Sequence, residues 1–338
     1  ESVEFRSVIA PMFESEYVYG AQVDESWPGY ELLHKYYDLF GLELNYYQIK
    51  DMLGKNEPIK MIVPKNSDIE GYDSLNHILT IQNKNDETYH ITFDGYIPSD
   101  LKIKVINSNV TIIENYLGNV EESNFIIDVD ENSKLTRFSI LVDNTSSSKV
   151  LRSVNNSGYY QSMQIDLTDY DIDSTENINL MNDESYAEVV DGIYAINKAN
   201  KKYQTNLNHY KGNSSSKAQI FAINNDFAHV SIFTDAFIKN GATRTKTTQE
   251  GRIINLSDTC SGIVLPNLHI DENDVEASHS CSVGSVNQEH MYYLESRGLS
   301  KLQARNILIR GYFNPLLENV KDEKIKDELI KVLDQRIG

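Results

Sequence analysis

The feature that most constrains this chain is a long series of short apolar runs separated by turn residues, from about residue 60 to residue 285. Runs such as 78–81, 138–142 and 229–233 are rich in β-branched residues, and several alternate with polar positions, which is the pattern of β-strands. Clusters of Asn, Asp, Ser and Gly, for example 155–158 and 182–185, predict turns between the runs. The sequence therefore predicts a mainly β protein.

The number of runs exceeds what a simple sandwich needs, so sandwich, propeller and parallel β-helix all remain open from the pattern alone. The turn phrases do not recur at one fixed period, which excludes a strict sequence repeat. A β-helix whose coils differ in length would give the same irregular spacing.

The two ends of the chain have helical patterns. A turn at Trp27-Pro28-Gly29 precedes apolar residues spaced by three and four, which predict an amphipathic helix over 30–44, and 46–53 predicts a second one. We expect three regions: a mixed helical region at 1–70, a β core at 71–285 and a helical region at 286–338.

Capping residues mark the expected ends of the C-terminal helices. Asn287 is a suitable N-cap for a helix that Gly298 ends, and Ser300 caps a second helix that we expect to end at Gly311. Pro315 is expected to open a third helical segment.

Composition excludes several functions. The formal net charge of −19 disfavours nucleic acid as a partner. No apolar run is long enough to span a membrane, and no signal peptide is visible, so we expect a cytoplasmic protein. The chain has two cysteines, which form no disulfide framework and fit a reducing compartment. No Walker A, Gly-x-Gly-x-x-Gly or Gly-x-Ser-x-Gly phrase occurs, so we predict that the chain is not an enzyme.

Three segments near the C-terminus carry the most specific patterns. Residues 274–286 read DVEASHSCSVGSV, 291–298 read MYYLESRG, and 304–313 read ARNILIRGYF. Upstream, 243–251 and 256–260 add TRTKTTQEG and LSDTC. Together they resemble the C-terminal part of the SufB/SufD family of iron–sulfur cluster assembly proteins.

The resemblance implies a right-handed parallel β-helix flanked by helical parts, and a role as a scaffold subunit. Such a subunit would pair with a SufB-like partner through the end of the β-helix and dock a SufC-like ATPase on its C-terminal helices. The apolar residues expected at that dock are Tyr292, Tyr293, Leu308, Ile309, Tyr312 and Phe313. A homodimer is possible when the chain is alone.

Two departures from the SufB pattern favour the SufD side of the family. Ser280 stands where SufB members usually have Glu, and Glu250 stands where they have Cys after a Thr-Gln pair. A SufB-like scaffold with its own cluster remains the alternative.

His279 is the candidate that the resemblance favours for cluster assembly, and Cys281 and Cys260 are further candidates. A neutral imidazole can bind iron beside thiolates. Cys281 lies two residues after His279, so on an extended segment both side chains point to the same face. The alternatives are a hydrogen-bonded corner for His279 and buried packing for the cysteines.

Two cysteines cannot complete a cysteine-rich cluster site. No cofactor is therefore predicted on this chain alone, and an iron–sulfur cluster is expected only at an interface shared with a SufB-like partner. A chain with too few cysteine ligands of its own fits a heterodimeric scaffold, in which the partner supplies the rest.

A different class of function is a β-helical carbohydrate-active enzyme, which uses paired carboxylates. The acidic run at Asp166, Asp169, Asp171 and Asp173 suggests this function, although an acidic turn in an edge loop is the favoured explanation.

Overall fold

The computed structural model describes residues 59–63, 71–73, 75–94, 101–117, 122–141, 146–286 and 288–319, together with six residues between 326 and 334. The helices predicted at 30–44 and 46–53, and Asn287, lie outside these residues. The strands are β1 (Ile59–Val63), β2 (Tyr72–Asp73), β3 (Ile78–Gln82), β4 (Asn85–Asp94), β5 (Leu101–Ile106), β6 (Asn109–Leu117), β7 (Glu122–Val129), β8 (Lys134–Leu141), β9 (Ser148–Asn156), β10 (Tyr159–Asp166), β11 (Ile172–Leu180), β12 (Tyr186–Ala195), β13 (Asn200–His209), β14 (Ser215–Asn224), β15 (His229–Ile238), β16 (Thr245–Asn255), β17 (Ser261–Ile270) and β18 (Val275–Ser285). Two helices follow, α4 (Gln288–Ser296) and α5 (Lys301–Asn319).

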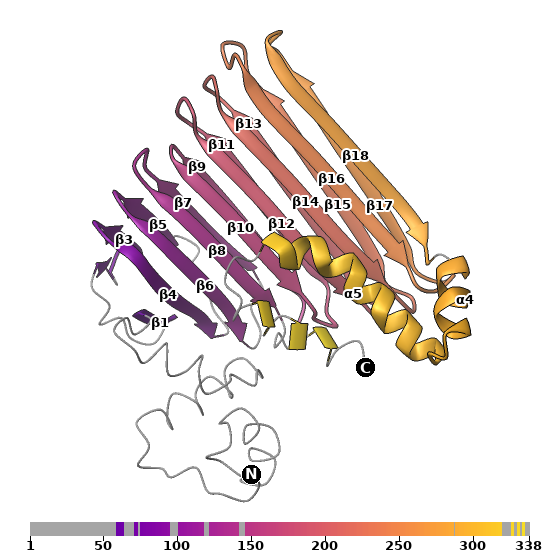
Figure 1. Cartoon of the computed structure of the whole chain (residues 1–338). Coiled ribbons are helices and arrows are strands. Elements are labelled where there is room, and N and C mark those ends of the chain that lie inside the picture. Colours follow the sequence, from indigo (N-terminus) through magenta and orange to yellow (C-terminus); the bar gives the residue numbers. More distant parts are fainter. Residues whose placement is uncertain are drawn as a thin grey trace, which may run out of the picture.

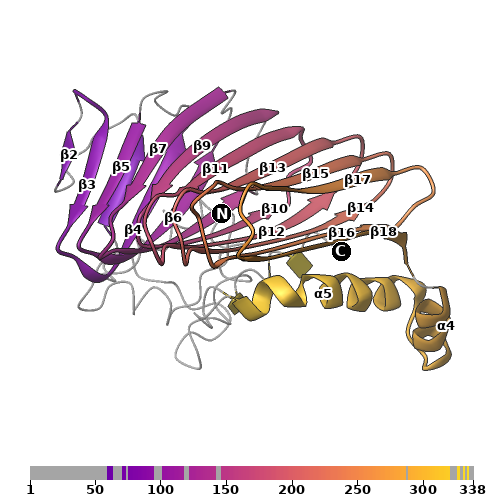
Figure 2. The same ribbon diagram turned by 90° about the horizontal axis from the view of Figure 1, so that it is seen from above.

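Successive strands alternate between two sheets of nine strands each (Figures 1 and 2). Sheet A runs β1-β4-β6-β8-β10-β12-β14-β16-β18, and sheet B runs β17-β15-β13-β11-β9-β7-β5-β3-β2. Every pairing is parallel except that of β2 with β3. Two stacked parallel sheets wound by one chain are a β-helix, which confirms the predicted fold class. Because β1 already pairs with β4, sheet A begins before residue 71.

The coils lengthen along the chain. Lys134, Tyr159, Tyr186, Ser215 and Lys246 lie in register on consecutive strands of sheet A, and the sequence interval between neighbours increases at each step. Strand length rises from 5 residues in β3 to 11 in β18. The lengthening explains why no fixed sequence period was found.

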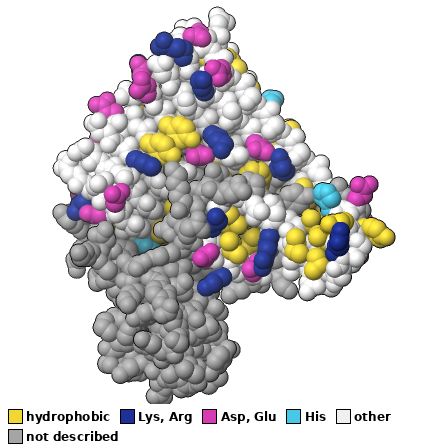
Figure 3. Space-filling view, in the orientation of Figure 1, with side chains coloured by type: hydrophobic (Ala, Val, Ile, Leu, Met, Phe, Trp, Pro, Cys, Tyr) yellow, Lys and Arg dark blue, Asp and Glu magenta, His cyan; other side chains and the backbone are white. Residues whose placement is uncertain are grey.

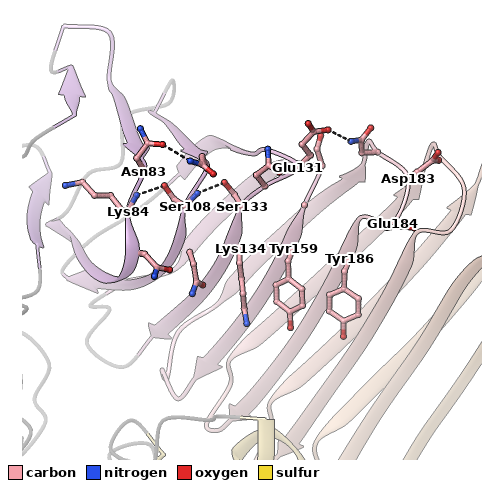
Figure 4. Close-up of a pocket in the computed structure, with 17 residues that line it drawn as sticks. Asn83, Lys84, Ser108, Glu131, Ser133, Lys134, Tyr159, Asp183, Glu184 and Tyr186 are labelled. Carbon is pink, nitrogen blue, oxygen red and sulfur yellow. Dashed lines mark hydrogen bonds between the residues drawn. The ribbon is translucent and has the colours of Figure 1, made fainter.

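The corner between sheet B and sheet A repeats one polar arrangement (Figure 4). The Ser133 hydroxyl accepts the Ser108 N–H at 3.0 Å, and the Ser108 hydroxyl accepts the Lys84 N–H at 3.0 Å. Asn83 and Asn107 have positive φ angles, which asparagine tolerates better than most residues. These features are why turns rich in Asn and Ser can stack on one another.

The interior contains buried charges as well as apolar side chains. Arg137 lies 2.8 Å from Glu114 and 3.1 Å from Glu176, and Arg152 lies 3.4 Å from Glu114. Burial alone would raise the pKa of Glu114, but the two guanidinium groups outweigh burial and hold that pKa below its usual value. At Asp191, burial together with the Glu176 charge outweighs the attraction of the same two arginines and raises the pKa to about 8.

The outer face of sheet A is partly covered by α5, which packs on β12 and β14 (Figure 2). Ser300 caps this helix as predicted: its hydroxyl accepts the Gln303 N–H at 3.2 Å, and the Gln303 side chain accepts the Ser300 N–H at 2.9 Å. Gly298 has a φ of 94°, which confirms that α4 ends there.

The predicted break at Gly311 and the new segment at Pro315 were wrong, because α5 is one helix across both positions. Its buried residues Ile309, Phe313 and Leu317 are spaced by four and share one face. Packing of this face outweighs the backbone hydrogen bond that Pro315 cannot donate.

Candidate functional site at the open end of the β-helix

Among the described strands, the last coil of the β-helix has no further strand stacked on it. Strands β17 and β18 are terminal in sheets B and A, so each has a strand neighbour on one side only among the residues that the structure describes. Their length leaves long rows of backbone groups unpaired, and several apolar side chains beside them are exposed, namely Ile263, Leu265, Ile270 and Val283. Such an edge is a template for pairing with another strand.

The direction of the unpaired backbone groups follows from the hydrogen bonds at the ends of the β15–β17 and β16–β18 ladders. The N–H groups of Ser261 and Asp271 donate to β15, so the intervening odd-numbered residues of β17 also face β15 and the even-numbered ones face the free edge. Pro266 is one of the latter, and its missing N–H therefore removes no bond inside the sheet. In β18 the Val286 N–H donates to β16, which turns the odd-numbered residues, His279 and Cys281 among them, to the free edge.

The side chains of His279 and Cys281 lie on the inner face of β18. They are in register with Gln249 and Gly251 of β16, which are buried in the interior. Both are nevertheless exposed, because no further coil covers them in the part of the chain that the structure describes. The structure thus confirms that the two side chains share one face.

Cys260 lies apart from this pair. It precedes β17 at the corner after β16, where its thiol donates to the carbonyl oxygen of Ser257 at 3.1 Å. It is buried, and neither cysteine is in a disulfide. The structure therefore brings Cys281 to His279 but not Cys260.

Two residues missed in the sequence analysis shape the inner face beside the pair. The Gln249 amide nitrogen donates to the Asn267 carbonyl oxygen at 3.3 Å and so links β16 to β17. A Cβ on Gly251 would lie 2.3 Å from Cγ1 of Val264, so only glycine fits where the sheets approach closely. Their phrase, Thr-Gln-Glu-Gly, was noticed only as part of the family pattern.

The described residues contain no group of three or more His, Cys, Asp or Glu side chains that could hold a metal ion. His279 and Cys281 offer one imidazole and one thiol, whose chemistry suits iron. A cluster handled here as cargo would need further ligands from another chain.

The candidate docking residues on the helices fall into two groups. Tyr292 and Tyr293 are 76% and 55% exposed, whereas Ile309 and Phe313 are buried. Leu308 is half-buried, and the side chain of Tyr312 lies outside the described residues. Figure 3 shows hydrophobic side chains gathered over α4 and the adjoining part of α5. The exposed apolar residues that the sequence analysis missed there are Leu302 and Ile307.

The acidic run is divided between the interior and the surface of the β-helix. Asp166 points into the interior, where it lies 2.7 Å from the Lys201 ammonium. Asp171 accepts the Asn200 N–H at 2.7 Å, and Asp173 pairs with Lys202 on the outer face at 3.6 Å. The four carboxylates therefore do not form one site: Asp169 and Asp171 line a surface pocket together with Asp226, whereas Asp166 and Asp173 are paired elsewhere with lysines. The carbohydrate-active alternative depends on that pocket alone.

The fold and this site define a class of protein, a parallel β-helix with an open last coil and a C-terminal helical appendage. Residues 103–312 match the family model described as "SUF system FeS cluster assembly, SufBD core domain". This match covers well over half of the chain, which therefore belongs to the SufBD family of iron–sulfur cluster assembly proteins.

Individual relatives agree with the family model. The chain is similar to the iron–sulfur cluster assembly protein SufD of Bacillus subtilis (strain 168), with 29% identity over 245 residues, 68% of this chain and 55% of that protein. It is also similar to SufD of Plasmodium berghei (24% identity; 69% of this chain, 18% of that protein) and to SufD of Escherichia coli K12 (33% identity; 21% and 17%). The chain thus spans about half the length of the Bacillus relative. No helix among the described residues is long and apolar enough to cross a membrane.

Proposed function

We propose that the chain is a scaffold subunit of a SUF-type assembly complex, pairing with a SufB-like subunit through β17 and β18. The observation that carries this proposal is the open end, where two long unpaired strand edges lie beside His279 and Cys281. Pro266 removes one donor from the free edge of β17, and the remaining groups of both edges are a template for a partner strand.

In this proposal the chain supplies cluster ligands and positioning and carries out no catalysis of its own. His279 and Cys281 present their side chains and their unpaired backbone groups at the same edge, so a partner strand bound there would bring its own side chains beside them. The incomplete ligand set on this chain fits a cluster that is held between two subunits.

The helices are proposed to dock a SufC-like ATPase. Tyr292 and Tyr293 present apolar area that the β-helix does not cover, and Ile309 and Phe313 hold α5 on sheet A. A partner that moves α4 and α5 would therefore transmit force to strands β12 and β14, close to the open end.

A SufB-like role is the second candidate. The two departures from the SufB pattern, Glu250 and Ser280, are register partners on the outer face of β16 and β18. Glu250 is already engaged by Arg252 at 2.7 Å and Gln219 at 3.1 Å, so that position offers no free thiol or carboxylate. The SufD-like role is therefore the better supported one.

The test is co-expression with SufB-like and SufC-like proteins, size-exclusion chromatography, and iron and sulfide assays of the complex. We expect a ternary complex whose cluster content falls in His279→Ala and in Cys281→Ser. Ser278→Ala, on the opposite face of β18, is the matched control and should retain the cluster. Failure of the wild-type chain to bind either protein would refute the scaffold role, and an unchanged cluster in both variants would refute the role of the pair.

A further inference from the structure

The outer face of sheet B carries a row of side chains in register, one carboxylate followed by three amides. Asp128, Asn155, Asn179 and Asn208 lie on consecutive strands from β7 to β13. Each asparagine donates its side-chain N–H to the oxygen of the residue before it, at 2.8, 3.0 and 3.1 Å. The row thus has one direction, with every donor pointing toward the N-terminal coils.

On the next two strands, β15 and β17, the same row continues with aromatic side chains in place of amides. Asn208 is in register with Phe237, and Phe237 with His269. The rings of Phe237 and His269 are stacked, with centroids 4.4 Å apart and an angle of 6° between their planes. The row therefore reaches β17, the terminal strand of sheet B, at the exposed side chain of His269.

A second row runs beside it through Asn177, Asn206, Asp235 and Asn267. Asn206 donates to Asn177 at 2.6 Å, and Asn267 donates to Asp235 at 2.9 Å. The His269 ring joins the two rows, with Nε2 3.3 Å from the same Asp235 oxygen.

Both rows end at β17, where their last side chains can still make a hydrogen bond or a ring contact. The side-chain N–H of Asn267 points back to Asp235, so its oxygen is left to accept a bond from the free side. One face of the His269 ring is covered by Phe237, and the other is turned to the free edge. Neighbouring strands stand about 4.8 Å apart, so an added strand would place side chains directly against both groups.

We propose that these two rows select the strand that pairs with β17. That strand belongs to a second, related β-helix and carries two outward side chains two residues apart: a hydrogen-bond donor against Asn267 and a flat ring against His269. This inference rests on the proposed function, because it specifies how the SufB-like partner is recognised. The rows favour a β-strand as the bound element, because each row is made of residues that lie in register on neighbouring strands. A further strand beside β17 would continue both rows.

The test measures the affinity of the full chain for the SufB-like partner by titration calorimetry. We expect Asn267→Leu and His269→Ala each to weaken binding about threefold, and the double variant about tenfold. His269→Phe keeps the flat ring and should stay within about twofold of wild type. Asn177→Ala removes the far end of the same row and is the matched control, with no expected effect. Thermal melts of each variant confirm that the fold is retained.

The outcomes separate this inference from the proposed function. A wild-type complex whose affinity is unchanged in the double variant overturns the inference and leaves the scaffold role intact. Absence of any wild-type complex overturns both. If the isolated chain instead forms a dimer by sedimentation that only the double variant abolishes, the rows select a second copy and the assignment to a different β-helix is overturned.

Discussion

Glu114 and Cys281 occupy the same column of the interior, yet their surroundings are opposite. The column runs from Glu114 through Ser139, Gln164, Asp191, Ile220 and Gly251 to Cys281, all in register on the inner face of sheet A. Glu114 is sealed between coils and held by two arginines, whereas Cys281 is exposed. In a β-helix the number of coils beyond a residue decides whether an inward side chain is structural or available to a partner.

The largest effect on the free energy of unfolding is expected in the buried part of the column. Arg137→Met would leave Glu114 and Glu176 short of their cation, and removing one partner of a buried ion pair typically costs about 3–5 kcal/mol. Urea unfolding measures this loss. Arg252→Met is the control, because its pair with Glu250 is exposed and should be worth less than about 1 kcal/mol. Equal losses of stability in the two variants would contradict the idea that burial makes the Arg137 ion pairs more important than the exposed one.

The next effect concerns Asp191, halfway along the column, and depends on pH. The folded pKa of Asp191, about 8, lies well above the usual pKa of an aspartate, so the folded state holds a proton that the unfolded state releases. The associated stability is fully present below pH 4 and is lost as the pH rises through 8, with about 2 kcal/mol of the loss between pH 6 and 8. Asp191→Asn should lack this loss, which unfolding at several pH values would show. Parallel pH profiles for the two proteins would mean that Asp191 is charged at neutral pH.

A smaller effect is expected one strand from the end. In Gly251→Ala the new methyl group meets Val264, and we expect a loss of about 1–2 kcal/mol. Gly284→Ala on β18 is the matched control, since nothing lies within 4 Å of its added Cβ. Thermal unfolding of the two variants should differ. A neutral Gly251→Ala would show that the two sheets separate easily near the opening.

The smallest effect is expected at the opening itself. The double variant His279→Ala, Cys281→Ala should change the unfolding free energy of the isolated chain by no more than about 0.5 kcal/mol, because both side chains are exposed. Hydrogen exchange adds a second check: the amides of His279 and Cys281 should exchange faster than those of Ser278 and Ser280, which face β16. A large loss of stability would assign the pair to the core.

Strands with apolar inner faces were predicted from the sequence, but strands with polar inner faces were not. Strand β11 reads IDSTENINL, and its first residues were taken as part of an acidic run. Its inward Glu176 is paired with Arg137, which is 39 residues away in the sequence. Alternation cannot reveal such a strand, because the partner that permits burial lies in another coil.

The candidate site shows the same limit. The spacing of His279 and Cys281 was enough to predict a shared face, because that relation is local. The position of Gln249 beside His279, and of Asn267 at the end of a row, depends on register between strands about 30 residues apart. Local patterns contain no information on that register.

The lengthening of the coils has a mechanical consequence for any chain bound at the open end. With about 3.3 Å per residue, the 11 residues of β18 give a contact edge about 36 Å long at the broadest part of a tapered body. A tilt of about five degrees about one end of that edge separates the other end by about 3 Å, the length of one hydrogen bond. A small rotation of a bound chain would therefore break the hydrogen bonds at one end of the interface, while the other end stays in contact and acts as a hinge.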